Sequence, residues 1–89
     1  MADFNYVEWD SEEDTAGNTQ HIGDNGLTRD EVEDVLYDPA GRGVQSRSSR
    51  RPALIGKTST GKTIIVVYER HIDAEIVVIR PVTAYEIES

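Results

Sequence analysis

The stretch from residue 53 to residue 70 constrains the fold most, because it joins the strongest apolar run of the chain to a familiar phosphate-binding pattern. Gly56–Thr63 fits G-x-x-x-x-G-K-[ST], in which backbone amides cradle phosphates, the Lys neutralises them and the hydroxyl reaches Mg²⁺. That loop works only where a helix N-terminus supplies the oriented amides. Residues 64–68 are instead four β-branched residues and a Tyr, the composition of a strand. We therefore predict a hairpin turn at 58–62 and no binding of ATP or GTP.

The length and composition of the chain restrict its class. Its 89 residues predict one domain spanning 1–89, since a chain of this size has room for one hydrophobic core. The absence of Cys excludes disulfides, thiolate metal sites and a Cys nucleophile. No run approaches the roughly 18 apolar residues of a membrane span, and the N-terminus lacks the basic-then-apolar order of a signal peptide. We therefore expect a cytoplasmic protein without a membrane partner.

The formal net charge of −8 is unevenly distributed along the chain. Residues 1–38 carry 12 acidic residues and one basic residue, whereas residues 39–89 carry 5 acidic and 8 basic residues. An acidic protein is a poor general binder of nucleic acid, because that affinity depends on Lys and Arg neutralising phosphates. The basic residues of the second half form either one phosphate-binding patch or an ordinary solvated face with ion pairs. The clustered ones are Arg42, Arg47, Arg50, Arg51, Lys57 and Lys62.

The first part of the chain predicts a strand and a weak helix. Aromatic and polar residues alternate over 4–9, which indicates a half-buried strand. Ser11 is followed by three acidic residues and resembles a helix N-cap whose first turn favours the helix dipole. The helix behind it is weak, because Gly17, Asn18 and Thr19 are poor helix formers.

A second helix is predicted more strongly. Thr28 with Glu31 three residues later forms a capping box, and Leu27 with Val32 stands where a hydrophobic staple would close the helix start. Apolar residues then recur at helical spacing on one stripe. Pro39 ends the helix shortly after its last apolar residue.

The second half of the chain predicts strands. Residues 43–51 alternate but have little to bury, so they form either an edge strand or a mobile basic loop. Residues 71–74 predict a tight connection, and 75–80 a strand that is apolar on both faces and therefore central. Pro81 is expected to end its regular pairing. The short connections imply antiparallel neighbours. The predicted fold is α+β: an N-terminal strand, two helices, then an antiparallel β-meander covered on one face by the helices.

Short motifs follow one another through nearly the whole chain: Val7-Glu8-Trp9-Asp10, Asn18 with His21, Asn25-Gly26-Leu27-Thr28, Glu31-Val32-Glu33-Asp34-Val35, Ile55-Gly56-Lys57-Thr58 with Gly61, Val66-Val67-Tyr68, Glu69-Arg70, and Arg80, Thr83 and Glu86. In order and approximate spacing this series resembles the BrnT family, small toxins of bacterial type II toxin–antitoxin pairs with a fold similar to that of RelE. The resemblance implies metal-independent cleavage of RNA and a tight antitoxin partner.

The chain departs from the family pattern at several basic positions. Where the family tends to have a Lys before the Gly-Val-Ser/Thr turn, this chain has Asp24-Asn25, and a basic residue that opens the last strand is replaced by Glu75. The C-terminal helix of the family is reduced here to residues 82–87. Such sites work chiefly by electrostatic stabilisation of developing negative charge, so lost cations weaken the case for cleavage. The alternative is a non-catalytic relative that acts as a protein-interaction module.

Cleavage of RNA without a metal needs a group that takes the proton from the 2′-hydroxyl, a group that donates to the leaving oxygen, and cations around the phosphate. Only His21 and His71 have a side chain whose ordinary pKa lies near neutrality. The resemblance assigns catalytic roles to His21, Arg70 and Arg80, with Tyr68 orienting the substrate. His71 is predicted to lie in the connection at 71–74, exposed to solvent.

Each candidate also has a structural alternative. His21 would cap or pack the first helix, and Tyr68 would belong to the core, where strand aromatics usually pack. Arg70 and Arg80 would pair across strands with acidic neighbours, namely Glu69, Glu75 or Glu86.

The remaining predictions concern ligands. An RNA substrate would contact the basic residues Arg47, Arg50 and Arg51. The spacing of the two His residues gives no recognisable set of metal ligands, so we expect no metal and no cofactor. The expected partners are RNA and an antitoxin-like protein.

Overall fold

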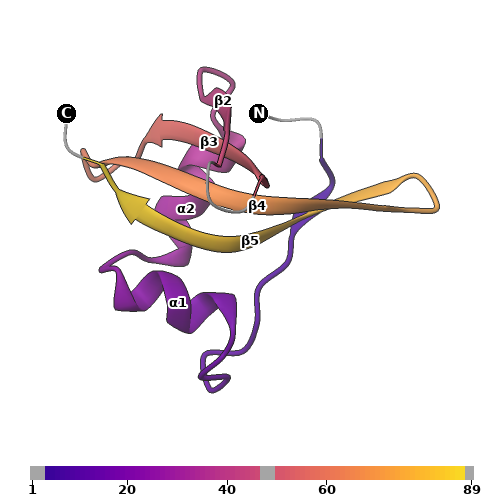
Figure 1. Cartoon of the computed structure of the whole chain (residues 1–89), viewed down its shortest axis with the longest axis horizontal. Coiled ribbons are helices and arrows are strands. Elements are labelled where there is room, and N and C mark those ends of the chain that lie inside the picture. The colour runs from indigo at the N-terminus through magenta and orange to yellow at the C-terminus, as the bar shows by residue number, and fades with distance from the viewer. Residues whose placement is uncertain (1–3, 47–49, 88–89) are drawn as a thin grey trace.

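The computed structural model describes residues 4–46 and 50–87, which form two helices and one five-stranded mixed sheet (Figure 1). The predicted α+β class is confirmed. In chain order the elements are β1 (Tyr6–Val7), α1 (Asn18–Asp24), α2 (Arg29–Tyr37), β2 (Arg42–Gln45), β3 (Pro52–Lys57), β4 (Thr63–Asp73) and β5 (Ile76–Glu86).

The sheet is not the simple meander that the sequence predicts. Its strand order is β1-β5-β4-β3-β2, in which β2 to β5 are antiparallel and β1 lies parallel to β5 at one edge. The strand β1 is shorter than the predicted 4–9, but the backbone amides of Asn5 and Glu8 donate to Val77 O and Ile79 O, each at 2.8 Å. The last strand therefore has neighbours on both sides, as its apolar composition predicts.

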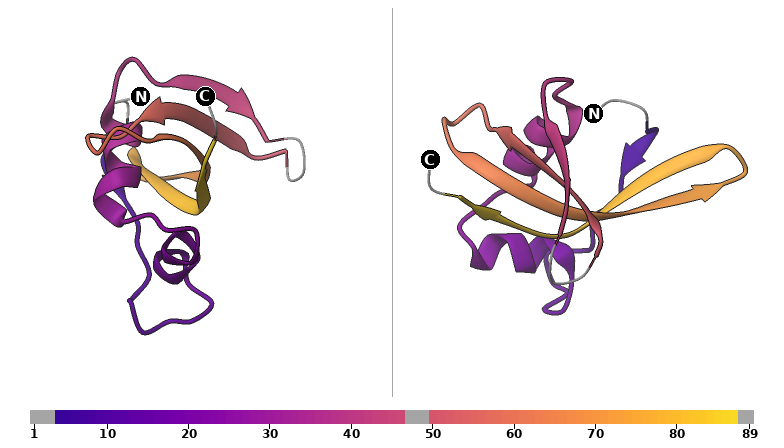
Figure 2. Two further views of the ribbon diagram at one scale, coloured as in Figure 1. Left: turned by 90° about the vertical axis from the view of Figure 1, so that its left-hand side faces the viewer. Right: turned by 45° about the horizontal axis from the view of Figure 1, so that its top comes forward.

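Both helices lie on one face of the sheet, with α1 packed on β5 and α2 packed on β3 and β4 (Figure 2). The core lies between these layers, and Phe4, Val7 and Trp9 pack against it. Its buried residues are Ile22, Leu27, Val32, Val35, Leu36, Leu54, Ile64, Val66, Tyr68, Ile79 and Ala84.

The two helix starts differ in how well the sequence predicts them. Thr28 Oγ1 accepts a hydrogen bond from the Glu31 amide at 3.2 Å and the Glu31 carboxylate accepts one from the Thr28 amide at 3.1 Å, so the capping box is confirmed. The N-cap predicted at Ser11 is wrong. Its hydroxyl accepts from the nearby Glu13 amide at 3.3 Å in a local turn, and α1 begins seven residues later behind Gly17.

The hairpin of β4 and β5 also differs from the expectation. Pro81 does not end the pairing; it lies opposite Tyr68 at a register shift, after which β5 continues to Glu86. A bulge tolerates a residue without an amide hydrogen, because one residue there is left out of the ladder. The turn lies at Ala74 and Glu75 rather than 71–74, which places His71 within β4.

Two further expectations are resolved. The segment between β3 and β4 is a hairpin loop over 58–62, as predicted, and is followed by a strand. Of the two alternatives for 43–51, the edge strand is correct for residues 43–45, which belong to β2 and pair with β3 at the border of the sheet, while residues 47–49 lie outside the described residues. Among the described residues, no helix is long and apolar enough to cross a membrane.

Candidate functional site

The face of the sheet opposite the helices carries a row of side chains across four strands. Leu54, Val66 and Ala84 are paired across β3, β4 and β5 and belong to the core beneath the helices. Their neighbours in sequence point to the opposite face, because side chains alternate along a strand. The cross-strand pairs place four residues in one row, which we call the outer row: Arg42, Ile55, Ile65 and Tyr85.

The outer row combines three kinds of side chain. Arg42 is exposed at one end, Tyr85 is 44% exposed at the other, and the two Ile residues form an apolar floor between them. The adjacent row toward the hairpin loop adds Lys57, which lies opposite Thr63. Surfaces that bind single-stranded nucleic acid use such a combination, with aromatic rings that stack on bases and cations that neutralise phosphates.

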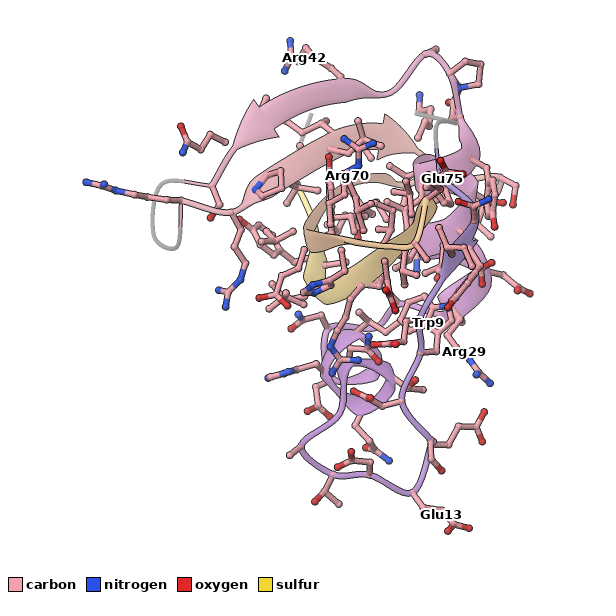
Figure 3. The ribbon with its side chains drawn as sticks, turned by 90° about the vertical axis from the view of Figure 1, so that its right-hand side faces the viewer. Trp9, Glu13, Arg29, Arg42, Arg70 and Glu75 are labelled. Carbon is pink, nitrogen blue, oxygen red and sulfur yellow. The ribbon has the colours of Figure 1, made fainter. Side chains whose placement is uncertain are left out.

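Acidic residues gather away from the outer row. Asp30, Glu33 and Asp34 lie on α2, and Glu12 and Glu13 lie in the loop before α1. Figure 3 shows Arg42 at the end of the molecule opposite Glu13. The acidic residues of α2 and of the loop before α1 are therefore separated in space from the outer row.

Arg80 is the best-anchored of the predicted site residues. Its guanidinium binds both carboxylate oxygens of Asp10, Nη1 to Oδ1 at 3.0 Å and Nη2 to Oδ2 at 2.8 Å, and Nη1 reaches Glu8 Oε1 at 3.2 Å. These hydrogen bonds raise the pKa of Arg80 above its usual value, and the bond from Arg80 is the largest cause that lowers the pKa of Asp10. The partners are thus carboxylates from the N-terminal segment, not the predicted Glu69, Glu75 or Glu86.

Asn18 forms hydrogen bonds with the same N-terminal segment and with β5. The side chain is 3% exposed, and its Nδ2 donates to Glu8 O at 3.0 Å and to Pro81 O at 2.9 Å. Its Oδ1 accepts from the Asp10 amide and its own amide donates to Asp10 Oδ2, both at 2.8 Å. The first residue of α1 therefore ties the N-terminal segment to β5.

The other predicted catalytic residues lie apart from Arg80. His21 is exposed in the last turn of α1, and Tyr68 is 8% exposed in the core. Arg70 is an exposed residue of β4, two positions after Tyr68 and opposite Ile79, so it lies on the side of the sheet that faces the helices. Arg80, opposite Glu69, lies on the other side. The structure thus brings Tyr68 and Arg70 onto one face and separates Arg80 from them.

The predicted RNA-binding residues lie at the β2–β3 connection. Arg51 Nε donates to Glu69 Oε2 at 3.1 Å, and the Glu69 carboxylate also meets His71 Nε2 at 3.3 Å. Both contacts lower the pKa of Glu69, and the one from Arg51 is the larger. Arg50 is exposed and has a left-handed backbone with φ 57°. Arg47 lies outside the described residues.

The phosphate-loop pattern serves a structural purpose here. Lys62 Nζ lies 3.1 Å from Glu31 Oε2, and Thr60 Oγ1 donates to the same oxygen at 2.6 Å. Glu31 is 5% exposed, and its pKa is lowered chiefly by the Thr60 hydroxyl and further by Lys62. Ser59 adds two hydrogen bonds to Asp34 Oδ2, of 3.0 Å from its amide and 2.7 Å from its hydroxyl. The loop is therefore docked onto α2.

The two glycines of the pattern are required for different reasons. Gly61 has φ +91°, which the hairpin turn requires and other residues rarely adopt. A Cβ at Gly56 would lie 2.9 Å from Val35 Cγ1, so this glycine lets β3 approach α2 closely.

Two clefts lie outside the outer row. One of about 530 Å³ opens between α1 and α2, where Ile22 and Leu27 form its base and the Arg29–Glu12 ion pair lies at its rim. The other, of about 370 Å³, lies beside β1. The part of the chain that the structure describes holds no group of three or more His, Cys, Asp or Glu side chains arranged to bind a metal ion.

Sequence reasoning missed Tyr85 as a candidate and named Arg42 only as one of several clustered cations. The period-two alternation of β5 places Tyr85 and Thr83 on one face of the sheet. This pattern was not used, because Pro81 was expected to end the strand. Compared with protein-family models and with curated proteins, the sequence matches none.

Proposed function

We propose that this protein is a BrnT-like, RelE-like component of a type II toxin–antitoxin pair that binds single-stranded RNA on the uncovered face of its sheet. The outer row supports the proposal, because it offers an exposed Tyr, an exposed Arg and an apolar floor on the face of the sheet opposite both helices. Base stacking on an aromatic ring is worth about 1–3 kcal/mol and tolerates any base. The acidic residues on the helical side would repel phosphates from that side and leave the uncovered face as the favoured one.

Cleavage is the activity that the family resemblance adds. His21 would act as acid or base, Arg70 and Arg80 would stabilise the phosphate, and Tyr68 would orient the substrate. These residues occupy different parts of the fold, so cleavage on the uncovered face would draw on Arg80 and the cations of β2 and β3, whereas Tyr68 and Arg70 would act from the other face.

A second candidate, a non-catalytic relative that binds a protein partner, is favoured by one observation. The charge of Arg80 is compensated by Asp10 and Glu8, with an N···O distance of 2.8 Å to Asp10. A guanidinium held in this way has little free charge to stabilise a transition state. The two candidates therefore differ in whether RNA that is bound is also cut.

Fluorescence anisotropy with labelled single-stranded RNA tests the proposal at low salt. Arg42→Ala and Tyr85→Ala should each weaken binding by about tenfold, which corresponds to about 1.4 kcal/mol. Tyr37→Ala is the matched control, because Tyr37 is 48% exposed but lies on α2. Equal affinity of all three variants would contradict the proposed surface.

Cleavage is tested with the same RNA and with a version in which every 2′-hydroxyl is replaced by hydrogen. A chain that cuts only the first substrate, and loses this activity on His21→Ala, uses the 2′-hydroxyl as nucleophile. A chain that binds both substrates and cuts neither supports the non-catalytic candidate.

A further inference from the structure

The end of the β4–β5 hairpin extends beyond the helices as an arm (Figure 1). We define this arm as residues 71–78, which lie between the core residue Ile79 and its partner Arg70 on one side and the end of the hairpin on the other. The arm exposes large apolar side chains. Ile72 is 66% exposed, Ile76 is 45% exposed, and Tyr6 of the adjacent β1 is 50% exposed. Ile76 and Tyr6 lie on the face opposite the helices, whereas Ile72, two positions after Arg70, lies on the other face. Neighbouring exposed apolar side chains such as Ile76 and Tyr6 mark interaction sites more often than singly scattered ones do.

One face of the arm is hollowed. The second cleft described above, which we call the arm groove, has a volume of about 370 Å³, near the lower end of the roughly 300–1,000 Å³ of ligand pockets. Strand pairing places its lining residues on the face opposite the helices, since Tyr6 lies opposite Val78 and Asp73 lies opposite Ile76. The lining consists of Tyr6, Glu8, His71, Asp73, Ile76 and Val78.

The rim of the arm groove is acidic. Asp73 is exposed and has no ion-pair partner in the part of the chain that the structure describes, and Glu75 follows it in the turn. Glu8 is partly compensated by Arg80 at 3.2 Å, and His71 contacts Glu69. Arg80 and His71 therefore already contact carboxylates, while Asp73 has no cationic partner among the described residues.

These features select one kind of occupant. Phosphate groups would be repelled by Asp73 and Glu75, so a nucleic acid is disfavoured there. The apolar floor between Tyr6 and Ile76 suits one or two aliphatic or aromatic side chains, and Asp73 suits a cation beside them. We propose that the arm groove binds a segment of a partner protein in which Lys or Arg lies next to an apolar residue. This inference does not depend on whether the uncovered face binds RNA.

A random heptapeptide library displayed on phage tests the proposal with the full chain as bait. Enriched peptides should carry Lys or Arg beside Leu, Ile, Met or Phe. Synthetic copies of them should bind Asp73→Lys and Ile76→Ser about tenfold or more weakly than the unchanged protein, as expected for the loss of a central interface contact.

The matched control is Asp24→Lys, a charge reversal at an exposed residue at the end of α1. This variant should bind the peptides as the unchanged protein does, and all three variants should retain RNA affinity and the circular dichroism spectrum. The proposal is overturned if no peptide is enriched, if the enriched peptides lack cations, or if Asp73→Lys and Ile76→Ser bind them normally.

Discussion

The ammonium group of Lys62 lies 3.1 Å from the carboxylate of Glu31, so the lysine of the phosphate-loop pattern already has an anionic partner within the protein. The Glu31 side chain is 7% exposed, and Lys62 also donates to Gly26 O at 3.2 Å. A phosphate would have to displace a nearly buried carboxylate from its cation. The pair thus joins the hairpin loop to the start of α2.

Lys62→Ala should lower the free energy of unfolding by about 1–2 kcal/mol, because a nearly buried carboxylate loses its cation, although the one-third exposure of Lys62 moderates the cost. Lys57→Ala, at an exposed position of β3, should change it by less than about 0.5 kcal/mol. Chemical denaturation measures both. Micromolar binding of ATP or GTP that Lys62→Ala abolishes would contradict a purely structural role.

The pH dependence of stability should follow the carboxyls with lowered pKa values, which include Glu31 and Glu69. A carboxyl whose pKa is lower in the folded state stabilises the protein above its unfolded pKa of about 4.3, and this stabilisation is lost as the pH falls through the folded pKa. The denaturation midpoint should therefore fall steeply below about pH 4.3. Glu31→Gln should flatten this fall, whereas Glu13→Gln, at an exposed loop position, should leave it unchanged.

Thr28→Ala should cost about 0.5–2 kcal/mol of stability, because the hydroxyl that accepts from the Glu31 amide is removed from the start of α2. Thr28→Ser keeps that acceptor and should recover most of the loss. Denaturation midpoints of the two variants provide the comparison. Equal losses for Ala and Ser would mean that the methyl group, not the cap, carries the effect.

The turn of the β4–β5 hairpin should be open to stabilisation. Ala74 and Glu75 have φ of 48° and 72°, and two positive values at the central positions are what a type I′ turn requires. The double substitution Ala74→Asn with Glu75→Gly should raise the free energy of unfolding by roughly 1 kcal/mol, since Asn and Gly adopt this backbone with less strain. In contrast, Gly61→Ala at φ +91° should lower it. A thermal melt that shows no gain for the double variant would argue against this turn type.

Binding of single-stranded RNA should weaken steeply with salt. If about three to five phosphates are neutralised, the log–log slope of affinity against salt should lie at about −2 to −3.5. Arg42→Ala should reduce the slope by about 0.7, because one phosphate contact is lost. A slope near zero would remove the electrostatic basis of the proposed surface.

If Arg70 and Arg80 act on the transition state, their Ala variants should lower cleavage more than binding.

The elements that the sequence predicted correctly are those defined by residues close together in the chain. The capping box of α2 and the hairpin loop at 58–62 depend on residues close together in the chain, so their signals are complete within a short window. The turn at Ala74 and Glu75 was predicted at 71–74 instead, because neither residue belongs to the types that usually adopt positive φ. The bulge at Pro81 was missed because its partner, Tyr68, lies on another strand.

The candidate site was less predictable than the fold. Arg80 binds Asp10 and Glu8 only because β1 lies beside β5, a pairing with no signature in either segment alone. The outer row likewise draws one residue from each of four strands. Composition indicated that cations were clustered, but their relation to an exposed Tyr depends on strand register.

The parallel pairing of β1 with β5 determines the order in which the fold can be completed. A hydrogen bond of 2.7 Å from the Val77 amide to Asn5 Oδ1 joins residues 72 positions apart, and Asn18 reaches Pro81 across 63 positions. On the ribosome, the N-terminal segment emerges early yet has no strand to pair with until the last hairpin has been synthesised. Contacts this distant in sequence form slowly, because the intervening chain must first lose its freedom. Of the strands of this sheet, β1 is therefore synthesised first and paired last.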